Sequence, residues 1–478
     1  MTSPRSGRVL SRVLLSALLA VVAFALVPDA ASAHGISGKT DLPIPRWLFA
    51  WAAAAVLIVS FVALAILWPK PRLQEERLRR LLRFPAFLEP LAGLFGIAVF
   101  VGVIYAGIAG EQNAFANILP TFVYVVLWVG VAFASVLFGD VFRAFNPWRA
   151  FARGVAWIST RATSGGLPAP LAYPERLGRW PAAAGILAFG WIELVLSDRD
   201  DPQLLAVLAL VYVAVQLVGM SLYGIEAWTR NADPFAVYFA TLARLAPLVT
   251  RERVLYGRAP LSGAPGLDQG AGTVALLAVM IGTTTFDGFS QGSVWTSLAP
   301  HLQDVFSGLG FSSEVALEAG FTVGLLAVVL IVAGLYRLGI EGMTTVGEHH
   351  RARELAQTFA HTLIPIAAAY VVAHYASLLI FQGQSMLFLV SDPLGTGADL
   401  FGTADNAVDY NAISPDGIWY IQVAALVIGH VGGLVLAHDR ALSLYRSSRR
   451  ATRSQYWMLA VMVGFTSLGL WLLSAASQ

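Results

Sequence analysis

Long apolar runs constrain the fold of this chain more than any other feature. A helix needs about 20 predominantly apolar residues to cross the hydrocarbon core of a bilayer, and inside a bilayer only helices and closed barrels satisfy every backbone polar group. Ten runs of suitable character follow one another along the sequence, near residues 47–68, 87–109, 117–138, 181–197, 204–224, 272–286, 316–337, 359–381, 418–438 and 456–475. The sequence therefore predicts an all-α, polytopic transmembrane helical bundle of about ten spans.

Composition agrees with a chain whose main partner is the lipid bilayer. Hydrophobic residues make up 57% of the chain and charged residues only 13%, an apolar surface that a soluble domain cannot hide. The absence of cysteine excludes disulfides, thiolate metal sites and cysteine nucleophiles. The sequence also lacks a Walker A loop, a GxGxxG motif and HExxH. ATP hydrolysis and dinucleotide chemistry therefore have no support.

The first 33 residues have the pattern of an export signal. A basic segment precedes an apolar core, and a small-x-small triplet follows, as a signal peptidase requires. These three parts are Arg5, Arg8 and Arg12, then residues 13–27, then Ala31-Ser32-Ala33. We expect a cleaved signal peptide over 1–33 and a single integral membrane helical domain over 34–478, which begins at His34. The alternative is an uncleaved anchor, although the apolar core is short for a span.

Arginine is distributed unevenly between the connecting segments. It is abundant after the first, third, fifth, seventh and ninth runs, whereas residues 110–116, 287–315 and 382–417 contain neither lysine nor arginine. By the positive-inside rule the basic segments are cytoplasmic. The sequence thus predicts a multi-pass protein of the cell membrane with both mature termini extracytoplasmic. Because topology accounts for the arginines, they do not indicate a nucleic-acid partner.

Two basic segments share a short motif that suggests an internal hairpin repeat. Asn146-Pro147 and Asp233-Pro234 each stand before an apolar-rich stretch. An Asn or Asp caps a helix N-terminus, and proline fits the first turn. We therefore expect each motif to start an amphipathic helix at the inner interface.

Acidic residues recur at the cytoplasmic ends of the inward-running spans, where they oppose the helix dipole. They are Asp140, Glu226, Glu341 and Asp439. Each has an arginine nearby in sequence, and ion pairs are usual at helix ends. The expected partners are Arg143, Arg230, Arg337 and Arg440. An inner cation or proton site is the alternative interpretation.

The outer half of the predicted bundle contains more ionisable groups than a purely structural bundle requires. Such groups are costly at membrane depth and normally face a protein interior or a wet cavity. Those expected on the outer side are His34, Glu193, Asp287, His301, Glu318 and His374. Their shared side of the membrane predicts a polar site in the outer half.

This set of residue types suits a divalent metal. Carboxylates with imidazoles hold Zn²⁺ and leave a position for water, whose pKa the metal lowers to about 7. The free amine and ring of an N-terminal His34 can chelate copper together, and imidazole suits copper. The predicted metal ligands are therefore His34, Asp287, His301 and His374. The simpler alternatives are a hydrogen-bonded interior histidine at 374 and mere sequence context at 34.

Several motifs occur together in this chain: His34-Gly35 after the signal, Gly38-x-x-Asp41-Leu42-Pro43-x-Pro45, a Trp-rich first span, Asn146-Pro147-Trp148-Arg149, and Phe286-Asp287-Gly288-Phe289. In this combination the chain resembles an actinobacterial group of polytopic membrane proteins whose members are often labelled fenitrothion hydrolase. The resemblance implies hydrolysis of an organophosphorus triester, a small neutral and apolar substrate that can reach an outer site from the lipid. For that chemistry the first catalytic candidates are Asp287 and His374, followed by Glu193 and Glu318, with one carboxylate as general base.

Two other functions fit the same sequence. A secondary transporter or permease is compatible with ten spans, repeated hairpins and polar clusters on both sides. In a membrane scaffold the polar groups would only lock helices together. A continuous polar path from Asp287 and His374 to the inner acids would favour transport, whereas a blind outer cavity would favour an enzyme.

Overall fold

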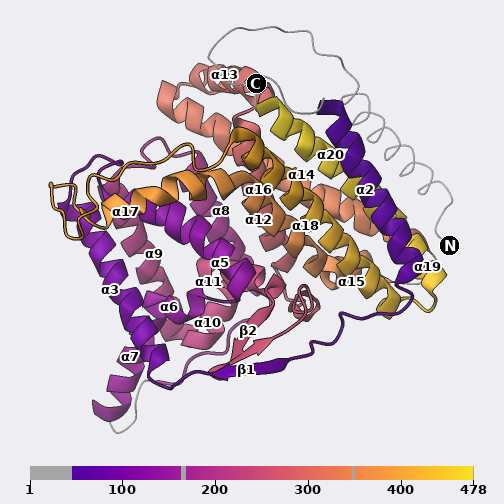
Figure 1. Ribbon diagram of the computed structural model, residues 1–478, viewed down its shortest axis with the longest axis horizontal. Coiled ribbons are helices and arrows are strands. Elements are labelled where there is room, and N and C mark those ends of the chain that lie inside the picture. The colour runs from indigo at the N-terminus through magenta and orange to yellow at the C-terminus, as the bar shows by residue number, and fades with distance from the viewer. Residues whose placement is uncertain (1–45, 163–167, 347–349, 477–478) are drawn as a thin grey trace.

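The computed structural model describes residues 46–162, 168–346 and 350–476 and is an all-α bundle (Figure 1). Every apolar run coincides with helix. The long helices are α2 Arg46–Leu67, α3 Leu88–Ala109, the consecutive α4 Ile118–Thr121, η1 Phe122–Gly130 and α5 Val131–Phe138, then α8 Trp180–Leu194, α9 Pro202–Tyr223, α12 Thr273–Ser290, α14 Ser313–Met343, α16 Ile364–Gln382, α18 Pro415–Leu444 and α20 Tyr456–Ala476. The predicted fold class is confirmed, while the expected signal peptide lies outside the described residues.

Helix length and composition make the chain a multi-pass integral membrane protein. Within the described ranges, seven helical segments are long and apolar enough to cross a bilayer. α8 and the Ala54–Leu67 part of α2 are apolar but shorter. The bundle therefore contacts lipid, and the count of ten spans stays a prediction.

α12 and α16 form the centre of the bundle. In the apolar stretches of α12 and of Ala352–Leu389, which contains α16, 67% of residues are buried, against 28–44% in the other five candidate spans. α12 packs against α8, α14, α16 and α20, and α16 packs along α18. Polar side chains on these two helices are thereby kept away from lipid, as their cost in hydrocarbon requires.

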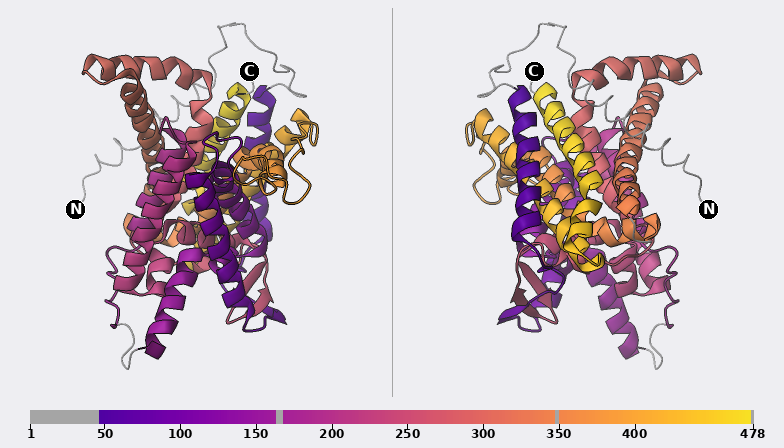
Figure 2. Two further views of the ribbon diagram at one scale, coloured as in Figure 1. Left: turned by 90° about the vertical axis from the view of Figure 1, so that its left-hand side faces the viewer. Right: turned by 90° about the vertical axis from the view of Figure 1, so that its right-hand side faces the viewer.

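Short elements connect the long helices. They are α6 Phe142–Phe145, α7 Pro147–Ala162, α10 Ile225–Asn231, α11 Pro234–Leu242, η2 Ala243–Leu245, η3 Ala264–Gly266, α13 Ser293–Gly308, η4 Thr344–Val346, α15 Ala352–Phe359, η5 Ala360–Leu363, η6 Gly383–Ser385, α17 Met386–Leu389 and α19 Ser448–Ser454. α13 lies across one end of the bundle, close to the level at which α20 ends (Figure 2).

A small antiparallel sheet lies at the opposite end of the bundle and joins two of the basic segments (Figures 1 and 2). Its strands β1 Arg79–Arg83, β2 Leu248–Arg251 and β3 Val254–Gly257 have the order β1-β3-β2. We call the end with this sheet inner and the end with α13 outer, because the arginine-rich segments belong to the former.

Both Asx-Pro motifs cap helices as predicted. Asn146 Oδ1 accepts from the Arg149 amide at 2.9 Å at the start of α7, and Asp233 Oδ1 accepts from the Ala236 amide at 3.1 Å at the start of α11. The two caps also touch, since Asn146 Nδ2 donates to Asp233 Oδ2 at 3.3 Å. The expectation of an interfacial α11 is wrong. Seven of its nine residues are buried, because its aromatic side chains pack into the core.

Candidate functional site

A cavity of about 820 Å³ lies between the outer parts of the central helices. We call it the outer chamber. Its volume falls within the range of small-molecule sites, which combine apolar walls with a few polar groups. The polar lining residues include Glu193, Arg199, Asp287, Gln291, His374, Tyr375, Gln382 and Gln422, and the aromatic ones include Phe289, Phe321, Phe381 and Tyr410.

An Asp–His pair lies on the wall of the chamber. Asp287 Oδ2 of α12 is 2.8 Å from Nε2 of His374 on α16. Asp287 is 9% exposed, and Gln291 Nε2 lies 3.5 Å from its other oxygen. The structure therefore brings together the two residues that the sequence analysis placed first.

α12 reaches Asp287 without a break. The helix continues through the threonine run at 283–285 to Ser290. The hydroxyls of Thr283 and Thr285 donate to the carbonyls four residues earlier, at 2.9 and 2.7 Å, which satisfies them inside the helix. Asp287 is thus held on a regular helix, which fixes the direction of its side chain.

Tyr375 links the Asp–His pair to a second carboxyl. Its hydroxyl donates to Asp287 Oδ2 at 2.9 Å and lies 3.4 Å from Glu193 Oε1 on α8. Sequence reasoning missed Tyr375. Its position beside His374 in the sequence AHYAS was the available signal, because neighbouring helical residues can reach one partner from two directions.

Among the residues that the structure describes, one ring nitrogen of His374, Nδ1, has no hydrogen-bond partner. With its Nε2–H directed at Asp287, Nδ1 carries the basic lone pair. A Cβ atom added at Gly288 would lie 3.6 Å from Nδ1, so the glycine leaves space beside this nitrogen. Both residues line the outer chamber. The arrangement can accept a proton from a water molecule in the chamber.

Neither Glu318 nor His301 lines the outer chamber. Glu318 Oε1 accepts from both the amide and the hydroxyl of Ser197 at 2.9 Å, so it ties the segment after α8 to α14. His301 is exposed on α13, with Nδ1 2.9 Å from the Ser297 carbonyl. His34 lies outside the described residues. Depth along the membrane did not determine which way Glu318 and His301 face.

The chamber does not complete a metal site from the residues that the structure describes. Within those ranges no group of three or more His, Asp or Glu residues is arranged to hold a metal ion. Asp287 and His374 offer two adjacent ligands, but the Tyr375 hydroxyl separates Glu193 from them. Catalytic zinc usually has three protein ligands. A divalent metal, Zn²⁺ or Cu, stays a prediction.

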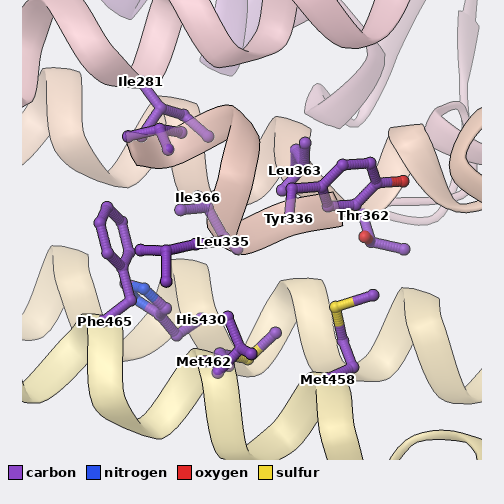
Figure 3. Close-up of a pocket in the computed structure, with 12 residues that line it drawn as sticks. Ile281, Leu335, Tyr336, Thr362, Leu363, Ile366, His430, Met458, Met462 and Phe465 are labelled. Atoms are coloured by element: carbon purple, nitrogen blue, oxygen red, sulfur yellow. The ribbon is translucent and has the colours of Figure 1, made fainter. Parts of the chain in front are cut away.

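Aromatic and apolar side chains line the chamber towards the inner side. Tyr370, Leu426 and Phe465 line its inner part, and the first two are only 7% and 2% exposed. Beyond them lies a cavity of about 50 Å³ that Phe465 also borders. Figure 3 shows mainly apolar side chains around this smaller cavity, together with His430. Of the described residues, Phe465 is the one that lines both of these cavities, so no polar side chain is common to them.

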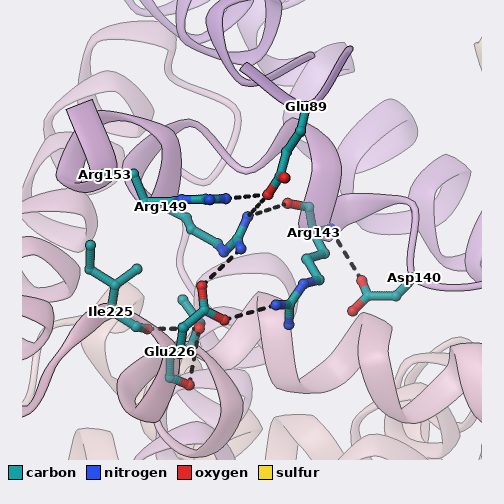
Figure 4. A network of polar contacts seen from close by, with 8 residues as sticks. Glu89, Asp140, Arg143, Arg149, Arg153, Ile225 and Glu226 are labelled. Carbon is teal, nitrogen blue, oxygen red and sulfur yellow. Dashed lines mark hydrogen bonds and ion pairs between the residues drawn. The ribbon is translucent and has the colours of Figure 1, made fainter. Parts of the chain in front are cut away.

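A second group of charges lies at the inner end of the bundle (Figure 4). We call it the inner cluster, and it consists of Glu89, Arg143, Arg149, Arg153 and Glu226. Glu226 is 2.8 Å from both Arg143 Nη2 and Arg149 Nη2. Arg149 Nη1 is 3.7 Å from Glu89, which also pairs with Arg153. Burial raises the pKa of the Glu226 carboxyl, and Arg149 and Arg143 lower it by more, so that its pKa lies below the usual value.

Of the four ion pairs expected for the inner acids, all between described residues, one forms. Asp140 accepts a hydrogen bond from the Arg143 backbone amide at 3.1 Å, and the partners expected for Glu226 and Asp439 are wrong. Glu341 pairs with Arg337 at 2.6 Å, as predicted. Glu226 instead reaches across to α6 and α7, because α10 packs against them. Asp439 accepts from the Trp68 indole at 2.9 Å, the Leu73 amide at 3.0 Å and the Gln74 amide at 2.7 Å. It thereby ties the segment after α2 to α18 and does not pair with Arg440.

Comparison with protein-family models finds no match, and no curated protein is significantly similar to the chain. The resemblance to proteins labelled fenitrothion hydrolase therefore stays a prediction. Function has to be inferred from the chemistry of the outer chamber.

Proposed function

We propose that this protein is an integral membrane hydrolase that cleaves a small, neutral, apolar ester, an organophosphorus triester, in the outer chamber. The observation that carries the proposal is the 2.8 Å contact between Asp287 and His374 on the chamber wall. A histidine that is oriented by a carboxylate can act as a general base.

In the proposed reaction His374 activates water. Nδ1 takes a proton from the water as its oxygen bonds to phosphorus, and the bond from phosphorus to the leaving group breaks. Asp287 holds the Nε2–H and stabilises the imidazolium that forms. General base catalysis of this kind contributes roughly 10²–10⁴ in rate.

The chamber lining suits such a substrate. Phe289, Phe321 and Phe381 provide apolar contact area for aryl or alkyl groups. Arg199 and Gln382 line the same space and carry the donors that a phosphoryl oxygen needs. A neutral triester partitions into the bilayer, and can approach the outer half of the bundle from the lipid.

The apolar inner boundary of the chamber favours an enzyme over a permease. Phe465 is the residue that the chamber shares with the smaller cavity of about 50 Å³, whose lining is mainly apolar. A transport route would need polar groups to continue past this boundary. A scaffold role would leave the free nitrogen of His374 and the volume of the chamber without a use.

The test is nitrophenol release from a phosphotriester by membranes that contain equal amounts of each protein. Asp287→Asn and His374→Gln are expected to lower kcat/KM by about 10²-fold or more. Asp304→Asn, an exposed carboxyl on α13, serves as the control and should retain the wild-type rate. Parallel assays with a chelator, then with added Zn²⁺ or Cu²⁺, test the predicted metal. Turnover that is unchanged in His374→Gln, or absent in wild type, contradicts the proposal.

A further inference from the structure

One hydroxyl lies between two carboxyls in the outer chamber. Tyr375 donates its single proton to Asp287 at 2.9 Å, yet its oxygen is also 3.4 Å from Glu193. If both carboxyls were ionised, an anionic oxygen of Glu193 would face the lone pairs of the Tyr375 oxygen with no hydrogen between them. A proton on Glu193 removes this conflict, because Glu193 then donates to the Tyr375 oxygen.

The surroundings of Asp287 favour an ionised carboxylate, whereas those of Glu193 favour a neutral carboxylic acid. Asp287 contacts His374, Tyr375 and Gln291, all of which can donate to a carboxylate. In the described part of the chain, Tyr375 is the one side chain within hydrogen-bond distance of Glu193. A buried carboxylate with so few donors is costly, whereas a neutral carboxylic acid is tolerated.

The charged and titratable groups that face Glu193 come from several elements. They are Asp287 on α12, Tyr375 on α16, Arg199 after α8, Tyr124 in η1 and Tyr238 on α11. Arg199 is the single fixed cation of this set, and it also lies 3.9 Å from Asp200. One partly engaged arginine does not balance two anionic carboxyls that interact through one hydroxyl.

We propose that Glu193 is a neutral carboxylic acid in the resting chamber and donates its proton to the leaving group. The donor role rests on the proposed hydrolase function, whereas the protonation of Glu193 does not. Glu193 lines the chamber together with His374, so the donor and the base face the same space. Tyr375 acts as a positioning residue that holds Glu193 as a neutral acid and Asp287 as a carboxylate.

The proposed step is balanced in protons. Water gives a proton to His374 Nδ1 while its oxygen bonds to phosphorus. The bond from phosphorus to the leaving oxygen breaks, and that oxygen takes the proton of Glu193. The imidazolium of His374 then returns a proton to the Glu193 carboxylate through chamber water. One water is consumed, a phosphodiester acid and an alcohol or phenol form, and both side chains regain their starting states.

Infrared spectroscopy tests the protonation of Glu193 without any activity assay. At neutral pH the wild-type protein in lipid should show a carbonyl band from a protonated carboxyl that is missing in Glu193→Gln. Glu318→Gln is the matched control, because Glu318 is hydrogen-bonded to Ser197 outside the chamber and its replacement should leave the band in place. A wild-type spectrum without a band that depends on Glu193 overturns the proposal. Glutamine mimics the neutral acid in size, so thermal unfolding of Glu193→Gln should match that of wild type.

Two triesters that differ only in leaving group test the donor role. Nitrophenol leaves readily as an anion, whereas phenol needs a proton. Glu193→Gln should lower kcat/KM by roughly 10²–10⁴ for the phenyl ester, and by a much smaller factor for the nitrophenyl ester. Glu193→Asp, which restores an acid, should recover part of the phenyl ester rate.

The outcomes separate the two proposals. Equal losses for the two esters overturn the donor role even if the infrared band is present. No turnover of either ester by wild type removes the hydrolase function and the donor role together, while the band still decides whether Glu193 is protonated.

Discussion

The outer chamber and the inner cluster both gather carboxylates and basic side chains, but they pair them differently. In the inner cluster each of Glu89 and Glu226 faces two arginines. In the chamber two carboxyls share one tyrosine hydroxyl, and Nδ1 of His374 has no hydrogen-bond partner among the described residues. Compensated charges hold elements together, whereas incompletely compensated groups in a cavity are suited to proton transfer. We therefore infer that the inner cluster stabilises the fold and that the outer chamber carries the proposed catalysis.

The two regions also differ in the elements that carry them. The chamber groups lie on α8, α12 and α16, in a cavity large enough for a ligand. The inner cluster joins the start of α3 to α6, α7 and α10. Arg149 has a side chain that is only 7% exposed, while its partners Glu89 and Glu226 are 39% and 49% exposed. It thus resembles a structural clamp at the membrane surface.

The largest expected effect is that of His374→Gln on the rate. Loss of the base should lower kcat/KM for a phosphotriester by roughly 10²–10⁴, with little change in thermal unfolding, because glutamine still donates a hydrogen bond to Asp287. Kinetics and unfolding are measured on the same preparation in lipid. A His374→Gln variant with a clearly lowered unfolding temperature would show that His374 has a structural role. It would contradict the difference that we propose between the chamber and the inner cluster.

Arg149→Met should lower the stability of the protein without lowering its rate of hydrolysis. Removing the clamp leaves Glu226 with Arg143 alone and Glu89 with Arg153, and should reduce the free energy of unfolding by about 2 kcal/mol. The rate per folded molecule should stay at the wild-type value. Arg153→Met is the matched comparison, and should cost less because the Arg153 side chain is 46% exposed. Equal losses for the two arginine variants would contradict the role of burial.

Gly288→Ala should separate activity from stability inside the chamber itself. Alanine in α12 should stabilise the helix by about 0.5–1 kcal/mol. Its methyl group would lie 3.6 Å from His374 Nδ1, an ordinary contact that the fold accepts but that covers the basic nitrogen. We expect a slightly raised unfolding temperature with a lower kcat/KM. A rate equal to that of wild type would show that water reaches His374 from another side.

The smallest effect concerns acid stability at the inner cluster. The pKa of Glu226 is lowered in the folded protein, so its contribution is present above its unfolded pKa and is lost as the pH falls through the folded value. Wild type should therefore be more stable than Glu226→Gln at pH 7, and this difference should shrink below about pH 4.5. Unfolding of both proteins is compared across this range. A stability difference between the two proteins that grows on acidification would contradict the lowered pKa of Glu226.

Local sequence patterns predicted most of the fold. Apolar runs specified helices because the bilayer permits few alternatives, and Asn146 and Asp233 were identified as caps because capping involves residues only a few positions apart. The sheet of β1, β2 and β3 was not foreseen, because its strands are short and β1 pairs with a partner far along the chain. The burial of α11 was also missed, since apolar composition alone does not tell core from interface.

The candidate site was predicted only in part, for a related reason. Hydropathy gives the depth of a residue in the membrane, which placed Asp287 and His374 at the same level. It does not give the rotation of each helix, so Glu318 was expected in a site that it does not face. Tyr375 was missed because a tyrosine in an apolar helix is usually a packing residue, and its role arises from partners on two other helices.

The most direct test of the contrast is the rate of phosphotriester hydrolysis per folded molecule, measured side by side for wild type, Asp287→Asn and Arg149→Met in the same lipid. We expect Asp287→Asn to lose about 10²-fold or more in kcat/KM while folding normally, and Arg149→Met to keep the wild-type rate per folded molecule despite its lower stability. Retained turnover in Asp287→Asn, or an equal loss in both variants, would contradict the assignment of chemistry to the outer chamber.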